Sequence, residues 1–158
     1  MAASRRLRVI GVAEYVDIPA WNVRALAAKV DTGARTSALH VENVEELGRR
    51  RVRFDVRLNR KLPREHVRVE ATISRRGRVR STNGVVKPRL FVEVNVSIGG
   101  VRRKIEVGLV DRRNMIYRML LGRSALARVF LVDPSRRFVL EKSRSASASA
   151  RREAADAC

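Results

Sequence analysis

Apolar and polar residues alternate along much of the middle of the chain. In residues 51–58 every second position is apolar, and the same pattern runs through 67–73 and 90–98. A period of two is typical of β-strands that bury one face and leave the other in water. The Gly-Gly pair at 99–100, followed by a further apolar segment at 101–110, predicts a hairpin.

The flanking segments have less regular patterns. Residues 7–18 are rich in β-branched side chains and predict a strand that bends at its central glycine. Residues 20–31 fit two interpretations, which are a short helix by composition or a buried strand in their last part, ended by a turn at Asp31. Residues 124–129 are the best helix candidate, and 129–142 predict a closing hairpin around "PSRR".

These segments amount to about eight to ten short strands, one reliable helix and no internal repeat. The predicted fold class is therefore all-β, as a small barrel or a folded sheet. We expect one folded domain over residues 5–142, after a loose N-terminus at 1–4. Residues 143–158 are rich in serine and alanine and lack any large apolar side chain, so we expect a disordered tail.

Composition excludes several classes of protein. No apolar run approaches the roughly 20 residues that span a bilayer, and the N-terminus lacks the apolar stretch of a signal peptide. Cys158 is the only cysteine, which excludes an internal disulfide framework and a metal site built on a cysteine pair. We therefore expect a cytoplasmic protein without a membrane partner.

Positive charge is the unusual feature of the composition. Lysine and arginine number 35 against 16 acidic residues, for a formal net charge of +19. A field of this sign attracts polyanions, which makes nucleic acid a candidate partner. Codon usage that favours arginine, together with solvated strand faces, would explain the same excess. Aromatic residues are only 4% of the chain, so the stacking platforms of single-strand binders are poorly supplied.

Only one short motif is a candidate for a catalytic site. The two histidines, His40 and His66, lie in no metal-binding spacing, and no nucleotide-binding loop or serine-nucleophile elbow is present. We therefore predict no metal and no cofactor. Residues 31–34, Asp-Thr-Gly-Ala, place a carboxylate between an apolar segment and a glycine. Taken alone this pattern is typical of a turn, but a strand that carries Asp31 into an interior would make it half of a catalytic site.

A second motif lies close to the helix candidate. Leu120-Leu121-Gly122-Arg123 directly precedes it, and the two motifs in this order resemble those of retropepsin-like aspartic proteases. Five blocks ("IPA", "AKVDTGARTSALH", "RSTNGVVKPR", "DRRNMIYRMLLGR" and "FLVDPS") resemble, within that group, the family known as ATP-dependent zinc proteases. The resemblance covers about residues 8–142. Two departures are Arg118, where that family more often has proline, and Thr82, where it often has serine.

The resemblance implies a retropepsin-like acid-protease barrel with one short C-terminal helix, and an aspartic endopeptidase activity. Members of the family are often encoded near ATP-grasp ligases that add glutamate to proteins. The family's name includes zinc and ATP, but this sequence has no residues arranged to bind either. One motif per chain implies a homodimer in which two copies of Asp31 form a dyad. The other aspartates lack the motif: Asp17, Asp55, Asp111, Asp133 and Asp156.

The resemblance also implies roles for individual residues, with Asp31 as the catalytic one. The residues implied to support the catalytic loop are Thr32, Gly33, Ala34, Leu121, Gly122 and Arg123. A flap over the substrate would have its tip at Ser81, Thr82, Asn83 and Gly84. Candidate pocket residues are Ser37 and His40. The basic surroundings favour an acidic substrate, such as a glutamate-modified protein tail. The alternative is a catalytically silent basic module that binds nucleic acid or another polyanion.

Overall fold

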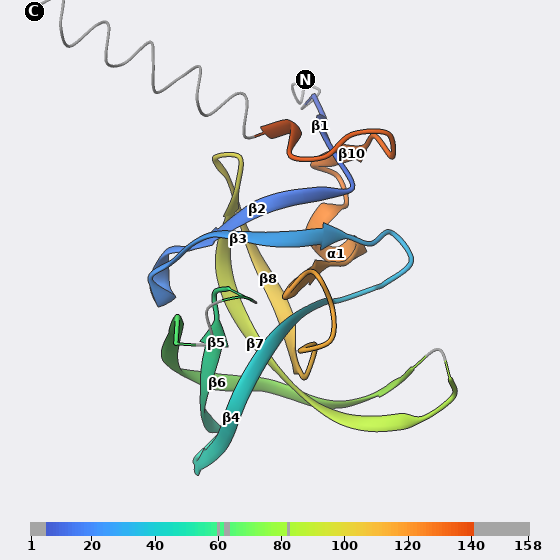
Figure 1. The fold of residues 1–158 in the computed structure, drawn as a ribbon. Coiled ribbons are helices and arrows are strands. Elements are labelled where there is room, and N and C mark those ends of the chain that lie inside the picture. The colour runs from blue at the N-terminus through green and yellow to red at the C-terminus, as the bar shows by residue number, and fades with distance from the viewer. Residues whose placement is uncertain (1–5, 60, 62–63, 82, 141–158) are drawn as a thin grey trace, which may run out of the picture.

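Strands make up most of the molecule (Figure 1). The structure is a computed structural model, and it describes residues 6–59, 61, 64–81 and 83–140. The strands are β1 (Arg8–Ile10), β2 (Ala13–Ile18), β3 (Val23–Val30), β4 (Ser37–Gly48), β5 (Arg51–Arg57), β6 (His66–Arg80), β7 (Val86–Ile98), β8 (Val101–Val110), β9 (Met119–Leu121) and β10 (Phe130–Val132). A 3-10 turn, η1 (Pro19–Trp21), and a short helix, α1 (Arg123–Leu126), complete the list.

Eight of the strands form one sheet, in the order β2-β3-β9-β4-β5-β6-β7-β8. Two further pairings, β2 with β7 and β4 with β8, join strands that lie far apart in this order. The sheet therefore closes on itself as a barrel. Beyond the barrel, β6 and β7 continue together as a long hairpin that extends away from the body (Figure 1). The predicted all-β fold with one short helix is confirmed.

Alternating side chains fill the barrel as the sequence pattern predicts. Val52, Phe54 and Val56 on β5 are fully buried, and every second residue of β7 from Val92 onward is buried as well. Trp21 packs edge-on against Phe54, with ring centroids 5.5 Å apart. Burial of large apolar side chains on this scale is the main source of stability of such a barrel.

The helix interpretation of residues 20–31 is wrong. After η1, the chain forms β3, which pairs antiparallel with β2 and parallel with β9. Both edges of the alanine-rich segment thus find partners, and these tertiary pairings override its local helix propensity. Ala25 also takes a left-handed backbone conformation, with φ of 51°, and donates its N–H to Asp17 Oδ1 at 2.8 Å.

The predicted closing hairpin at 129–142 is also wrong, as far as the described residues extend. β10 pairs in parallel with β1 from the other end of the chain. After a turn at Asp133, the chain returns without forming a strand, and Phe138 stacks on Tyr15 at a centroid distance of 4.4 Å. The predicted helix is shorter than expected because Ala127, with φ of −56° and ψ of 136°, already leaves the helical conformation.

A buried carboxylate explains how this C-terminal segment is held. Glu14 is fully buried and accepts N–H groups from Gly11 at 2.9 Å, Val139 at 2.9 Å and Leu140 at 3.3 Å. These bonds satisfy backbone donors that a second strand would otherwise have paired.

The expected loose ends, 1–4 and 143–158, lie outside the described residues. Within the described part of the chain, no helix combines the length and the apolar composition needed to cross a membrane.

Candidate active site

The Asp31 loop begins where β3 ends. Asp31 donates its backbone N–H to the carbonyl of Leu121 at 2.9 Å, which continues the pairing between β3 and β9 by one residue. Gly33 N–H donates to Asp31 Oδ1 at 2.9 Å, and Ala34 N–H donates to the Asp31 carbonyl at 3.3 Å. The loop is therefore a tight turn that fixes one carboxylate oxygen and leaves the other free to act.

β9 supports this loop from below. The strand lies between β3 and β4, in parallel register with Val30 opposite Leu121 and in antiparallel register with Ala38 opposite Leu120. Leu121 is fully buried. Leu120 and Leu121 of the second motif therefore lie in the strand that pairs with the end of β3, directly before Asp31.

Gly122 allows a close approach between the second motif and the segment that follows the Asp31 loop. A Cβ at this position would lie 2.5 Å from the carbonyl oxygen of Thr36, which is backbone and cannot swing away. Gly122 N–H donates to Ser37 Oγ at 3.2 Å, and Ser37 is itself fully buried. A glycine is therefore required here by space.

Arg123 clamps the loop from the start of α1. Its backbone N–H donates to the Ala34 carbonyl at 2.8 Å. Its guanidinium donates from Nη1 to the carbonyls of Thr32 at 3.0 Å and Gly33 at 2.9 Å. The six residues predicted to support the loop are thus gathered around Asp31, and the Thr32 side chain remains exposed.

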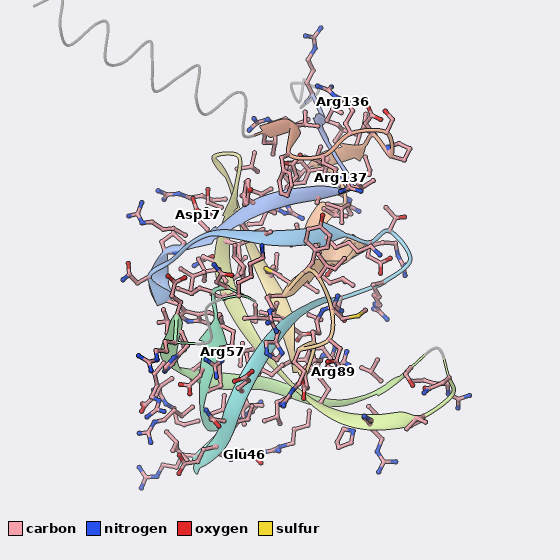
Figure 2. All side chains as sticks on the ribbon, viewed as in Figure 1. Asp17, Glu46, Arg57, Arg89, Arg136 and Arg137 are labelled. Atoms are coloured by element: carbon pink, nitrogen blue, oxygen red, sulfur yellow. The ribbon has the colours of Figure 1, made fainter. Side chains whose placement is uncertain are left out.

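A cavity of about 1110 Å³ opens beside Asp31. Its wall holds only two described carboxylates, Asp31 and Asp111, and both flap strands contribute to it. Figure 2 shows one wall residue, Arg89, where the β6–β7 hairpin leaves the barrel. Eight basic side chains line the cavity: Arg35, Arg75, Arg78, Arg80, Lys87, Arg89, Arg112 and Arg113. A site with this charge favours an anionic ligand.

The predicted flap corresponds to the end of the β6–β7 hairpin. Ser81 N–H donates to the Val85 carbonyl at 2.9 Å, and Gly84 N–H donates to the Ser81 carbonyl at 2.9 Å. Gly84 has a φ of 82°, a left-handed conformation that favours glycine. Ser81 Oγ also contacts the Asn83 side chain, while Thr82 lies outside the described residues. The cavity is lined by the flap strands at 78–80 and 87–89, and the described tip residues lie beyond it.

The two candidate pocket residues, Ser37 and His40, are buried behind the cavity wall and do not line it. His40 Nδ1 accepts the backbone N–H of Arg112 at 2.8 Å, so the ring proton is on Nε2, which lies 3.1 Å from Glu42 Oε1. Glu42 Oε2 in turn accepts from Arg57 Nε at 2.6 Å. His40 therefore ties the cavity wall at Arg112 to β4 and β5.

Burial lowers the pKa of His40 below its ordinary value. Glu42 and Asp111 oppose this shift, and the charge of Arg118 reinforces it. Below about pH 6.5 His40 becomes protonated in the unfolded chain but stays neutral in the folded one. The free energy of unfolding should therefore fall as the pH falls. The slope contributed by His40 is at most about 1.4 kcal/mol per pH unit.

We expect His40→Asn, which retains an acceptor near the place of Nδ1, to lose this slope between about pH 6.5 and 5. Urea unfolding across this range measures it. The control is His66→Gln, which changes the other histidine and should keep the slope of the unmodified protein. An equal slope in His40→Asn and the unmodified protein would contradict this assignment.

Asp111 is a poor partner for Asp31 within one chain. It accepts from the Arg113 side chain at 2.9 Å and from the Arg113 backbone at 3.1 Å. These bonds hold the pKa of Asp111 below its ordinary value, which suits an ion-paired carboxylate and not a proton donor. Of the two described carboxylates in the cavity wall, Asp31 is thus the one without an ion pair to an arginine among the described residues.

Sequence patterns do not single out several residues of the wall. Phe91 lies under the guanidinium of Arg75, with Arg75 Cζ 3.7 Å from the ring centroid. Arg89 and Arg112 are half-buried beside it. Arg112 lies within a block that supports the family resemblance, but nothing in the spacing of these residues marks them as neighbours.

Metal ligands are not gathered anywhere in the described chain. Among residues 6–59, 61, 64–81 and 83–140, no three His, Cys, Asp or Glu side chains are placed to hold an ion. The zinc in the name of the resembling family therefore has no fitting set of ligands there.

Comparisons with known proteins agree with the motifs. The family model described as RimB-like, retropepsin-like aspartic endopeptidase RimB, matches residues 9–143. A protein from Shewanella halifaxensis is 36% identical over 135 residues, and one from Parasynechococcus marenigrum is 33% identical over 129 residues. Both carry the name probable alpha-L-glutamate ligase. The matches cover 84% and 80% of this chain but only 30% and 28% of those proteins, so the chain spans less than a third of their length.

A solved structure shares the fold. The crystal structure of a protein of unknown function from Legionella pneumophila superimposes with a TM-score of 0.69 at 28% identity. The likeness covers 84% of this chain and 98% of that one.

Proposed function

Because the chain belongs to the RimB-like family of retropepsin-like aspartic endopeptidases, we propose that it cleaves peptide bonds with a dyad formed by Asp31 of two chains. The observation that carries the proposal is the position of Asp31, at the end of a strand and facing a large cavity, with one oxygen fixed by Gly33. The second carboxylate has no suitable source among the described residues of the same chain. A two-fold axis beside the exposed Thr32 would supply it.

The chemistry then follows from two carboxylates at close range. Like charges cannot both ionise there, so the pair holds one shared proton. The ionised carboxylate takes a proton from water as the water oxygen bonds to the scissile carbonyl carbon. The protonated carboxylate donates to the carbonyl oxygen. Collapse of the tetrahedral intermediate breaks the C–N bond. The amine leaves with a proton from one carboxylate, while the other takes a hydroxyl proton from the intermediate, which restores the single shared proton.

We also propose an acidic substrate, such as a protein tail that carries several glutamates. Eight basic side chains against two acidic ones in the cavity wall support this choice. The name of the relatives, probable alpha-L-glutamate ligase, also points to glutamate. The flap hairpin would fold over the bound peptide and exclude bulk water while keeping the attacking water in the site.

A glutamate-rich peptide should be cleaved with a kcat/KM at least about 10-fold above that of its glutamine counterpart at low salt. This advantage should shrink between about 0.05 and 0.3 M salt, because exposed charges are screened. Mass spectrometry of the products shows whether an internal bond is cut. If neither peptide is cut at high enzyme concentration, the peptidase proposal fails.

A second candidate is a binding module without catalysis, favoured by the charge of +19. Such a module would bind nucleic acid with an affinity that falls steeply with salt. Asp31→Asn would leave that affinity unchanged, whereas it should abolish peptide cleavage.

A further inference from the structure

Two half-buried arginines, Arg89 on β7 and Arg112 after β8, lie together in the cavity wall next to Asp31. Burial lowers the pKa of both guanidinium groups. The charge of Arg112 further lowers the pKa of Arg89, while the carboxylate of Asp31 raises the pKa of Arg112. The two cations are therefore close to each other, partly removed from water, and close to the catalytic aspartate.

These two arginines differ from others in the cavity wall in their ion pairing. Arg75 and Arg113 in the same wall form ion pairs with Glu106 at 2.8 Å and Asp111 at 2.9 Å. In the described part of the chain, by contrast, no carboxylate forms an ion pair with Arg89 or Arg112. Among the described residues, the one hydrogen bond of the Arg112 side chain is from Nε to the Tyr117 carbonyl, at 3.3 Å. Two adjacent desolvated cations are unfavourable without an anion between them.

The pair is nevertheless held in place. The stem of Arg89 lies across Gly108, where a Cβ would come within 2.5 Å of Arg89 Cδ. The backbone of Arg112 is fixed by its hydrogen bond to the buried ring of His40 at 2.8 Å. A site whose groups are positioned before the ligand arrives binds it more tightly. The pair therefore has the properties of an anion site: both residues line the cavity, the Arg89 stem and the Arg112 backbone are held, and no described carboxylate forms an ion pair with either guanidinium group.

We propose that Arg89 and Arg112 form a carboxylate-binding subsite that takes a glutamate or aspartate side chain of the substrate next to the scissile bond. Planar guanidinium groups bind carboxylates through two parallel hydrogen bonds, which adds geometric selectivity to the charge. The position beside Asp31 limits the effect to a substrate residue adjoining the cleaved bond, whereas the exposed flap cations act on the peptide as a whole. This subsite rests on the proposed peptidase function.

The test uses two peptides that differ by glutamate or glutamine at one position beside the cleaved bond. Binding to the Asp31→Asn protein is measured by calorimetry, so that no turnover is needed. We expect the glutamate peptide to bind at least about 10-fold more tightly, in keeping with a charged hydrogen-bonded pair. Adding Arg89→Gln or Arg112→Gln should reduce this ratio to within about 3-fold.

Two matched variants separate position from charge. Gly108→Ala keeps every charge but pushes the Arg89 stem away, so it should also reduce the ratio. Arg78→Gln removes a flap cation from the same cavity and should weaken both peptides alike, leaving the ratio intact.

Equal affinities for the two peptides in the Asp31→Asn protein would overturn the subsite, even if the unmodified enzyme cleaves peptides. So would an unchanged ratio in Arg89→Gln and Arg112→Gln, or a loss of the ratio in Arg78→Gln. A preserved ratio without any cleavage by the unmodified enzyme would instead count against the peptidase function alone.

Discussion

Replacing Asp31 by asparagine should reduce kcat/KM for peptide cleavage by about 10⁴-fold or more, the scale seen when a central catalytic group is removed. Asparagine keeps nearly the same shape and can still accept the Gly33 N–H, which donates to Asp31 Oδ1 at 2.9 Å. It can neither take a proton from water nor share one with a second carboxylate. The loss should therefore appear in kcat, with little change in peptide affinity or in the melting temperature.

The matched control for this substitution is Asp111→Asn, which changes the other carboxylate of the cavity wall. Because Asp111 is paired with Arg113 at 2.9 Å, its loss should alter activity by no more than about 10-fold. Activity that survives in Asp31→Asn, or that is lost equally in Asp111→Asn, would contradict the assignment of Asp31 as the catalytic residue.

Replacing Gly122 by alanine should reduce both stability and catalysis. The new Cβ would lie 2.5 Å from the Thr36 carbonyl oxygen, so β9 or the segment after the catalytic loop must shift. Overpacking of this kind costs about 1–3 kcal/mol of unfolding free energy. The shift would also pull Leu121 away from the Asp31 N–H, now 2.9 Å from its carbonyl, and thereby misplace the carboxylate. We expect kcat of the folded protein to fall by about 100-fold, since small displacements of catalytic groups have large effects.

The control variant Gly11→Ala separates the loss of stability in Gly122→Ala from its loss of catalysis. A Cβ at Gly11 would meet a backbone oxygen just as closely, at 2.4 Å from the Arg136 carbonyl, but in the corner between β1 and β2, among residues that do not line the cavity. Urea unfolding should show a similar loss of stability in both variants, and only Gly122→Ala should lose kcat in its folded state. Equal catalytic rates in the two folded variants would show that Gly122 does not position Asp31.

The barrel could largely be predicted from the sequence, because its strands have one solvent-exposed face and one buried face. The alternation at Val52, Phe54 and Val56 marks β5 clearly, and the Gly-Gly pair marks the β7–β8 turn. The predictions for two segments were wrong because their structure depends on distant partners. The alanine-rich β3 is a strand because β2 and β9 pair with it, and β10 pairs with β1 instead of with the residues that follow it.

In the candidate site, too, some features could be predicted from the sequence and others depend on distant partners. The resemblance carried by two short motifs in the right order implies that Leu121, Gly122 and Arg123 lie near the Asp31 loop. The arginine pair in the wall does not, because Arg89 and Arg112 are brought together only by the register of β7 against β8 and by the space above Gly108. Likewise, the buried position of His40 depends on its bond to the Arg112 backbone, which no local pattern reveals.

The central claim is that each active site uses Asp31 from two chains, and mixing experiments test it most directly. Unmodified protein is mixed with an equal amount of Asp31→Asn protein under conditions in which subunits exchange. If one asparagine in the dyad stops the reaction, only the pairs of two unmodified chains remain active, and total activity should fall to about one quarter of that of the same total amount of unmodified protein. If each chain worked alone, activity would remain at about one half, and that result would contradict the shared dyad.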